Sequence, residues 1–204
     1  MVDVPKQVNI CECWARDGIQ GWDPFVPTEK KIAIINRMVE IGFKRIEATS
    51  FAHPKLIKQF ADSMEVLKGI QRPKDLTYIA IIPNDKALDR LFEACNMGVG
   101  VQEITAILSA SEDHLLANLE RTFAEAMPPL ASIVKRARQA GIKVIGCIGT
   151  AFGCPLAYPI ANELDGCQGQ GIACGRHSLQ SIRAFDAPYE LAGIGIASND
   201  IGVA

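Results

Sequence analysis

Short apolar runs alternate with longer amphipathic segments over the first three quarters of the chain. These strand-like runs cover residues 8–13, 45–49, 76–82, 101–108 and 143–148, and all but 45–49 are mainly apolar. The segments between them carry apolar residues at helical spacing and cover residues 27–42, 55–69, 85–98 and 112–140. In the last of these we expect a break at Pro128 and Pro129. A strand followed by a helix, repeated in this way, predicts a parallel βα sheet.

A parallel βα series can close into an eight-stranded barrel or remain an open, doubly wound sheet. No glycine-rich dinucleotide fingerprint follows the first apolar run, which argues against the open dinucleotide-binding fold. Polar residues follow the carboxyl ends of several runs, namely Arg16, Asp17, Glu47, Thr49, Ser50, Asn84, Ser109 and Ser111. Barrel enzymes build their sites at that edge, although doubly wound sheets bind ligands there too. We therefore expect an α/β fold of the TIM (β/α)8 type, with the doubly wound sheet as the alternative.

The repeating pattern fails beyond about residue 156. A barrel of this type typically needs about 250 residues, so the 204 residues here predict an incomplete barrel of about five to six βα units. We expect residues 1–156 to form the N-terminal part of a barrel domain. Residues 157–204 form a divergent tail that ends in a segment resembling a sixth strand. We interpret residues 157–195 as a scrambled segment, of the kind a frameshift produces.

Composition narrows the class of protein. The chain is 49% hydrophobic and 22% charged, with a formal net charge of -2, which is typical of one globular domain. The near-neutral balance and the absence of a long basic run argue against nucleic acid or an anionic membrane as partner. No apolar run approaches the roughly 20 residues of a membrane span. Seven scattered cysteines and a start without signal or transit features predict reduced thiols and a cytoplasmic location.

The first candidate site is the stretch "CWARDGIQGW" at residues 13–22. Asp17 offers hard oxygen atoms to a divalent cation, and Arg16 can hold a carboxylate or a developing enolate oxygen. Gly18 permits a tight turn after the strand. These residues suit a site that stabilises negative charge on a carbonyl substrate. The alternative is a surface loop closed by a salt bridge between Arg16 and Asp17.

A second acid, Glu47, lies in the next predicted strand, within "RIEATSFAHPK" at residues 45–55. If the two strands are neighbours, Glu47 and Asp17 flank one pocket. The alternative is that Glu47 pairs with Arg45 or with a lysine inside the barrel. His53 precedes a proline and is more typical of a loop than of a metal ligand.

Four ordered segments carry a resemblance to a known family. They are "VNICECWARDGIQ", "GFKRIEATSFAHPKLIKQFADSMEVLKGI", "SASEDHLLANL" and "GTAFGCPLA", within about residues 6–157. Together they resemble hydroxymethylglutaryl-CoA lyase and its relatives. The resemblance implies a TIM barrel that uses Mg²⁺ or Mn²⁺ and acts on an acyl-CoA. It implies cleavage of 3-hydroxy-3-methylglutaryl-CoA to acetyl-CoA and acetoacetate.

The resemblance also implies roles for individual residues. Asp17 would be a metal ligand, Arg16 the cation that stabilises the enolate or carbonyl, and Glu47 a catalytic carboxylate near the substrate. Gln20 and Ser50 would line the substrate pocket. The chain ends "SNDIGVA" where the family reads roughly "GDTIGVA". Asp200 is therefore a weak substitute for the family's catalytic aspartate, since it stands one residue away.

Other parts of the family's pattern do not occur in this sequence. The family takes metal ligands from a His-x-His pair and a later Asn, and a catalytic Cys from a Gly-Gly-Cys-Pro loop, and none of these is found here. Cys154 matches an earlier Gly-Cys-Pro turn, which predicts a structural role. The spacing of Cys167, Cys174 and His177 fits no common zinc motif. We therefore expect little lyase turnover. The alternatives are a lyase or aldol-type synthase for another 3-hydroxyacyl-CoA, or a non-catalytic fragment that pairs with a partner chain or forms a homo-oligomer.

Overall fold

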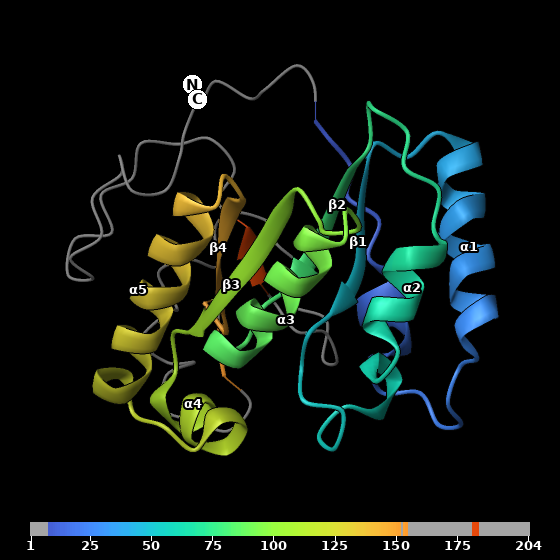
Figure 1. Cartoon of the computed structure of the whole chain (residues 1–204). Coiled ribbons are helices and arrows are strands. Elements are labelled where there is room, and N and C mark those ends of the chain that lie inside the picture. Colours follow the sequence, from blue (N-terminus) through green and yellow to red (C-terminus); the bar gives the residue numbers. More distant parts are fainter. Residues whose placement is uncertain (1–7, 152, 155–180, 184–204) are drawn as a thin grey trace, which may run out of the picture. The chain divides into compact units, whose positions relative to one another are not determined.

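The structure, a computed structural model, describes residues 8–151, 153–154 and 181–183, and these form an α/β arrangement of strands and helices (Figure 1). The chain divides into two compact units. The first contains the described residues up to Thr105 together with Gly141–Lys143, and the second contains Ala106–Ala140 and the described residues from Val144 onward. Among the described residues, no helix combines the length and the apolar composition that crossing a membrane requires.

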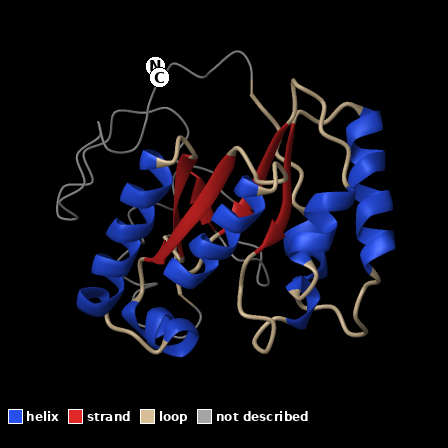
Figure 2. Cartoon of the chain, in the orientation of Figure 1, coloured by secondary structure: helices blue, strands red, loops and turns tan. Residues whose placement is uncertain are grey.

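The first unit is built on parallel strands in the order β1-β2-β3. The strands are β1 (Arg45–Ser50), β2 (Thr77–Ile81) and the beginning of β3 (Glu103–Ser109). Its helices are α1 (Thr28–Ile41), α2 (Ser63–Gly69) and α3 (Asp85–Asn96), with a π-turn η1 (Trp14–Gly18) and a 3-10 turn η2 (Lys58–Phe60). Helices α1 and α2 pack on each other and on β1 (Figures 1 and 2).

The core of this unit lies between the sheet and its helices. Most residues of the three strands are buried, as expected for parallel strands covered on both faces, although only β2 and β3 read as largely apolar runs. Ile46, Ile79 and Ile104, one from each strand, are fully buried. From α3, the apolar stripe that includes Leu88 and Leu91 is fully buried as well.

One irregularity in β1 determines which side chains share a face of the sheet. Glu47 pairs with Ile79 of β2, but the next pair is Thr49 with Ala80, so Ala48 forms a β-bulge. Ser50 then pairs with Ile81. Because residues paired across parallel strands point to the same side, Glu47 and Ser50 lie on one face although three positions separate them. Thr49 points to the other face and donates from its Oγ1 to Ser63 Oγ of α2, at 2.8 Å.

The predicted first strand at residues 8–13 is wrong except at one position. Glu12 forms an isolated parallel bridge to Ile46, with hydrogen bonds from Glu12 N to Arg45 O and from Glu47 N to Glu12 O. The apolar residues before it are not covered, since Val8 is 73% exposed and Ile10 is 68% exposed. Alternating apolar residues form a strand only where a neighbour buries one face, and among the described residues none does so here.

The second unit contains the rest of β3, helices α4 (Glu112–Leu119) and α5 (Phe123–Gln139), and β4 (Lys143–Gly149) from its second residue onward. A short strand, β5 (Ser181–Arg183), pairs antiparallel with β4. This strand lies in the stretch for which we predicted a divergent tail. The rest of residues 157–204 falls outside the described residues, so the predicted domain boundary stays a prediction.

The helical stretch 112–140 breaks earlier than predicted. The break lies between α4 and α5, at Glu120, whose φ of 54° ends α4 in the left-handed region. Thr122 then starts α5 with a capping box: its Oγ1 accepts from Glu125 N, and the Glu125 carboxylate accepts from Thr122 N. Pro128 and Pro129 lie inside α5. The cap, and not the proline pair, therefore determines where the helix starts.

The predicted helix at residues 55–69 is also shorter than expected. The structure has the 3-10 turn η2 at Lys58–Phe60 and helix α2 only from Ser63. The α/β class with parallel strands is confirmed, and the strands that follow the first candidate are found within about two residues of their predicted bounds.

Candidate functional site

The "RDG" segment forms a single π-turn that directly follows the Glu12 bridge to β1. At the start of this turn, Asp17 N donates to Cys13 O at 2.7 Å. Ala15 and Ile19 are buried, at 2% and 0% exposure. Ile19 packs in a cluster with Phe60, and Trp14 contacts the same cluster. Packing on both sides of the turn therefore fixes the backbone that carries Arg16 and Asp17.

Gly18 is required in this turn for a reason other than the one we predicted from sequence. A Cβ at this position would come within 2.8 Å of Trp14 Cδ1, closer than carbon atoms can approach. The residue therefore leaves room for the Trp14 indole. A glycine is needed here because the Trp14 indole lies too close to where a Cβ atom would be.

Arg16 makes the central contact of the site. Its Nε–H donates to Oε1 of Glu47, and the two side chains form a salt bridge in which Arg16 is 11% exposed and Glu47 is fully buried. A buried carboxylate is stable as a charge only when it is paired and hydrogen-bonded. Glu47 therefore holds the guanidinium in one orientation. The alternative pairing of Glu47 with Arg45 is wrong, since Arg45 instead pairs with Glu103.

Asp17 lies at the solvent side of the same arginine. Arg16 Nη1 donates to Asp17 Oδ1 at 2.7 Å, and the Asp17 side chain is 51% exposed. The Arg16–Asp17 salt bridge that we considered as an alternative is thus present, and the same arginine also pairs with the buried Glu47. A guanidinium has five N–H groups, and Glu47 and Asp17 together engage two of them. The others have no partner that is recorded among the described residues.

Two further side chains near the turn lie in the segment that carries the family resemblance, but we predicted no role for them from the sequence. The Sγ–H of Cys13 donates to Oε2 of Glu47 at 3.6 Å, so the thiol and Arg16 contact different oxygens of one carboxylate. The Glu12 carboxylate accepts from Trp14 N at 3.0 and 3.2 Å. Both contacts orient the start of the turn.

Ser50 shares the face of Glu47 because of the bulge at Ala48. It is 2% exposed, and its Oγ accepts from Ala52 N at 3.1 Å. Ile81 of β2 pairs with Ser50 of β1 on one side and with Thr105 of β3 on the other, so the three residues lie in one row across the sheet. The Thr105 hydroxyl is buried and has no hydrogen-bond partner in the described part of the chain. The face that carries Glu47 therefore has a hydroxyl group on either side of Ile81 at its carboxyl end.

The structure thus brings Arg16, Asp17 and Glu47 into direct contact and places Ser50 on the face of Glu47. Gln20 is half-buried and directly follows the buried Ile19. Asp200 lies outside the described residues, and its predicted role stays a prediction. The roles assigned to the other five residues are likewise taken up below as proposals.

The described residues do not by themselves make a divalent-metal site. In this part of the chain, no group of three or more His, Cys, Asp or Glu side chains is placed to hold a metal ion. Asp17 is the exposed carboxylate of the site, and it already accepts a hydrogen bond from Arg16. Mg²⁺ and Ca²⁺ sites in proteins use several oxygen ligands, and of these the described residues offer the exposed carboxylate of Asp17.

Comparison with known proteins places this site in a family. The family model described as HMGL-like matches residues 7–163, more than half of the chain. The chain belongs to the HMGL-like family. Hydroxymethylglutaryl-CoA lyase YngG of Bacillus subtilis is 37% identical over 159 residues, which are 78% of this chain and 52% of that protein. The mitochondrial hydroxymethylglutaryl-CoA lyase of Bos taurus is 40% identical over 157 residues, 77% of this chain and 47% of its own length.

Solved structures of HMGL-like proteins superpose on the chain. The HMG-CoA lyase of Bacillus subtilis does so with a TM-score of 0.68 and 36% identity, covering 74% of this chain and 49% of that one. An HMG-CoA lyase from Acinetobacter baumannii, solved with coenzyme A and 3-methylmalate, gives a TM-score of 0.66 and 39% identity over 73% of this chain and 47% of its own. The chain spans about half the length of the relatives it matches. The predicted family is confirmed.

Proposed function

We propose that this HMGL-like chain carries the Arg16 half of a carbon–carbon lyase site for an acyl-CoA, with 3-hydroxy-3-methylglutaryl-CoA as the substrate. One observation supports this most directly: Glu47, fully buried, anchors the guanidinium of Arg16 through Nε. The outer N–H groups of Arg16 then stand at a fixed place beside Asp17. A preoriented cation of this kind stabilises charge that develops on an oxygen.

The reaction needs such a cation at one step. A base removes the proton of the 3-hydroxyl group, and the electrons of that O–H bond form the ketone of acetoacetate. The bond between C2 and C3 breaks, and its electrons move to the thioester as an enolate, which is then protonated to acetyl-CoA. Arg16 is placed to donate hydrogen bonds to the thioester oxygen as it becomes negative. Glu47 keeps the guanidinium in position, and Ser50 and Gln20 border the acyl group.

A divalent ion, Mg²⁺ or Mn²⁺, would act as a Lewis acid on the substrate oxygens when bound. Asp17 is the residue proposed to contact it. Since the described residues supply one carboxylate that also binds Arg16, we route no step through the ion. We accordingly expect little acetoacetate release from the 204-residue chain in a coupled assay, even with added Mn²⁺. Robust release would contradict this expectation.

Binding of the substrate tests the proposal without requiring turnover. We expect the chain to bind 3-hydroxy-3-methylglutaryl-CoA in isothermal titration calorimetry, and Arg16→Met to weaken that binding by about 10- to 100-fold. This corresponds to the loss of about 1.5–3 kcal/mol from hydrogen bonds to a charged group. Arg37→Met is the matched control, because Arg37 is 70% exposed on α1 and pairs only with Glu40 among the contacts recorded. The proposal fails if the ligand does not bind, or if both variants bind it equally well.

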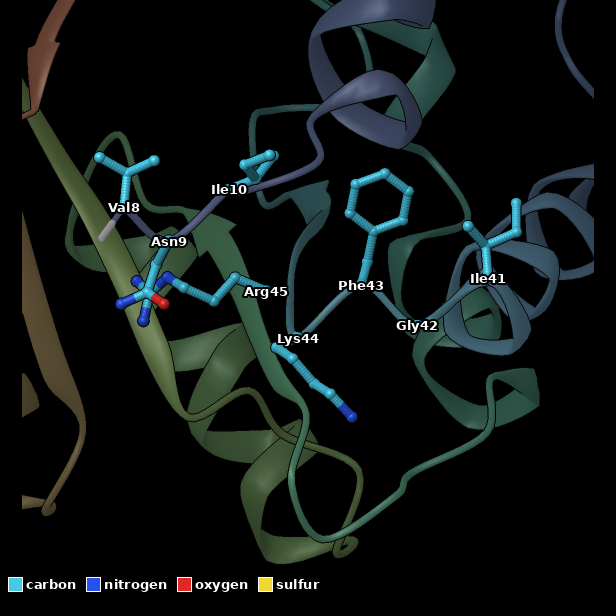
Figure 3. Close-up of a pocket in the computed structure, with 8 residues that line it drawn as sticks. All are labelled: Val8, Asn9, Ile10, Ile41, Gly42, Phe43, Lys44 and Arg45. Atoms are coloured by element: carbon cyan, nitrogen blue, oxygen red, sulfur yellow. The ribbon is translucent and has the colours of Figure 1, made fainter. Parts of the chain in front are cut away.

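A second candidate function is association with another chain, and the amino end of β1 favours it. A pocket of about 310 Å³ lies there, bordered by Val8, Ile10, Ile41, Phe43 and neighbouring residues (Figure 3). Ile41 is 64% exposed, and Val8 and Ile10 are more exposed still. Exposed apolar side chains grouped in this way are typical of contact surfaces. Light scattering after size-exclusion chromatography tests this: a monomer at all concentrations would exclude self-association, and Ile10→Lys should shift any dimer toward monomer.

A further inference from the structure

The loop that follows the "RDGIQ" segment is fixed by one buried side chain from another part of the chain. Residues 22–26 connect the end of the Arg16 turn to α1 and lie outside any helix or strand. Gln59, in η2, is 3% exposed and reaches this loop from more than 30 residues away in sequence. Since the side chain of a glutamine is rarely so buried without a partner, its contacts define what it does.

All three contacts of the Gln59 amide are with the backbone of this loop. Nε2 donates to Trp22 O at 2.6 Å and to Pro24 O at 3.0 Å. Oε1 accepts from Val26 N at 3.0 Å. One planar amide thus binds two carbonyl groups and one N–H group that no regular element provides with partners.

Gln59 is itself held by a buried lysine. Lys31 of α1, at 3% exposure, donates from Nζ to the backbone carbonyl of Gln59 at 2.5 Å and to Asp62 Oδ1 at 2.7 Å. The same Nζ lies 4.0 Å from the centre of the Phe25 ring, on the loop. The turn η2, the start of α1 and the loop are therefore tied together around two buried polar side chains.

The loop is continuous with the turn that carries Arg16. Trp22 N donates to Ile19 O, and Ile19 and Val26 lie in one apolar cluster with Phe60, the neighbour of Gln59. We propose that Gln59 is a positioning residue for the Arg16 site: it fixes residues 22–26 and, through Ile19, the end of the turn. This rests on the proposed function only for its effect on ligand binding, since the effect on the loop is a property of the free protein.

Two variants separate positioning from general stability. Gln59→Leu removes all three hydrogen bonds at similar volume, whereas Gln59→Glu keeps the acceptor for Val26 N and loses both donors. We expect amide hydrogen exchange of peptides from residues 14–26 to accelerate about tenfold in Gln59→Leu. Gln59→Glu should accelerate it at least as much, because a buried carboxylate oxygen would face the carbonyl oxygens of Trp22 and Pro24. Exchange in β2 and α3 should stay within about twofold. Asn36→Ala is the matched control, because Asn36 Oδ1 also accepts from a loop backbone group, Gln71 N, before the amino end of β2.

A double-mutant cycle then tests the connection to Arg16. We expect Gln59→Leu to weaken binding of 3-hydroxy-3-methylglutaryl-CoA about five- to tenfold in the wild type, but less than about twofold in an Arg16→Met background. Unchanged exchange in residues 14–26 overturns the proposal, and so does an equal loss of affinity in both backgrounds. If Gln59→Leu does not fold, Gln59→Asn, which keeps the amide but shortens its reach to the loop, is judged by the same criteria. If the wild-type chain does not bind the ligand, the proposed function fails while the exchange experiment still decides the role of Gln59.

Discussion

The ion pair between Arg16 and Glu47 allows a quantitative prediction of stability. Removing one partner of a buried ion pair costs about 3–5 kcal/mol, because the other charge is left buried and unpaired. Arg16 retains 11% exposure, and the Cys13 thiol lies within hydrogen-bond distance of Glu47 as a second donor. We therefore expect Arg16→Met to lower the free energy of unfolding by about 3 kcal/mol. Glu47→Gln should lower it by about 2 kcal/mol, since its amide oxygen can still accept from Arg16.

The double variant Arg16→Met/Glu47→Gln removes both charges together. We expect it to cost about 3 kcal/mol, which is less than the sum of the single variants by about 2 kcal/mol. Urea unfolding followed by circular dichroism measures all four proteins, with m-values compared to show that the same surface unfolds. The exposed pair Arg37 and Glu40 provides the control cycle, for which we expect coupling within about 0.5 kcal/mol. Additive effects for Arg16 and Glu47 would refute the view that one holds the other.

Three further predictions follow from local contacts. Gly18→Ala should lower the unfolding free energy by about 1–3 kcal/mol and alter tryptophan fluorescence, because its Cβ would displace Trp14; an unchanged melt and spectrum would contradict this. Burial raises the pKa of Tyr78 to about 12, and the nearby Arg72 has a smaller, opposite effect. Absorbance at 295 nm should therefore show a phenol that titrates at higher pH than an exposed tyrosine, and this titration should be lost in Tyr78→Phe. The stability from the buried neutral phenol is then present below pH 10 and lost as the pH rises through about 12. Hydrogen bonds from the Thr122 backbone and side chain lower the pKa of Glu125 in the folded state. The stability that its carboxylate contributes is therefore present above about pH 4.5 and lost as the pH falls through that lowered pKa. The difference in melting temperature between Glu125→Ala and wild type should accordingly shrink as the pH falls below 4.5.

The parts of the fold that could be predicted from sequence are those buried on both faces. Most residues of β1, β2 and β3 are buried, and helix α3 has a clear apolar stripe. The run at residues 8–13 has the same composition but only Glu12 pairs with a neighbour. Composition does not reveal whether a neighbouring strand is present, and so this element could not be predicted reliably.

The sequence singled out Arg16, Asp17 and Glu47 and offered the Arg16–Asp17 salt bridge as an alternative, but it did not predict the ion pair between Arg16 and Glu47. The "RDGIQ" motif and Glu47 could be recognised by their types and order. The choice of Arg16 as partner of Glu47 follows from the bridge at Glu12, which brings the π-turn to β1. Arg45, which we named as an alternative partner of Glu47, lies on the same strand but forms a salt bridge with Glu103 of β3. Gln59 gave no signal, because a buried glutamine that binds loop backbone has no characteristic spacing.

The bulge at Ala48 has a consequence for how β1 can change during evolution. In an ordinary strand, losing one residue turns every later side chain to the opposite face. Here Ala48 is the extra residue, so a deletion at this position would leave Ser50 on the face of Glu47 and Thr49 toward α2. Two adjacent hydroxyl residues are consequently held by different contacts, and we expect them to tolerate different substitutions. Change at Thr49 is limited by the fit to a helix, and change at Ser50 by the chemistry of the face it shares with Glu47.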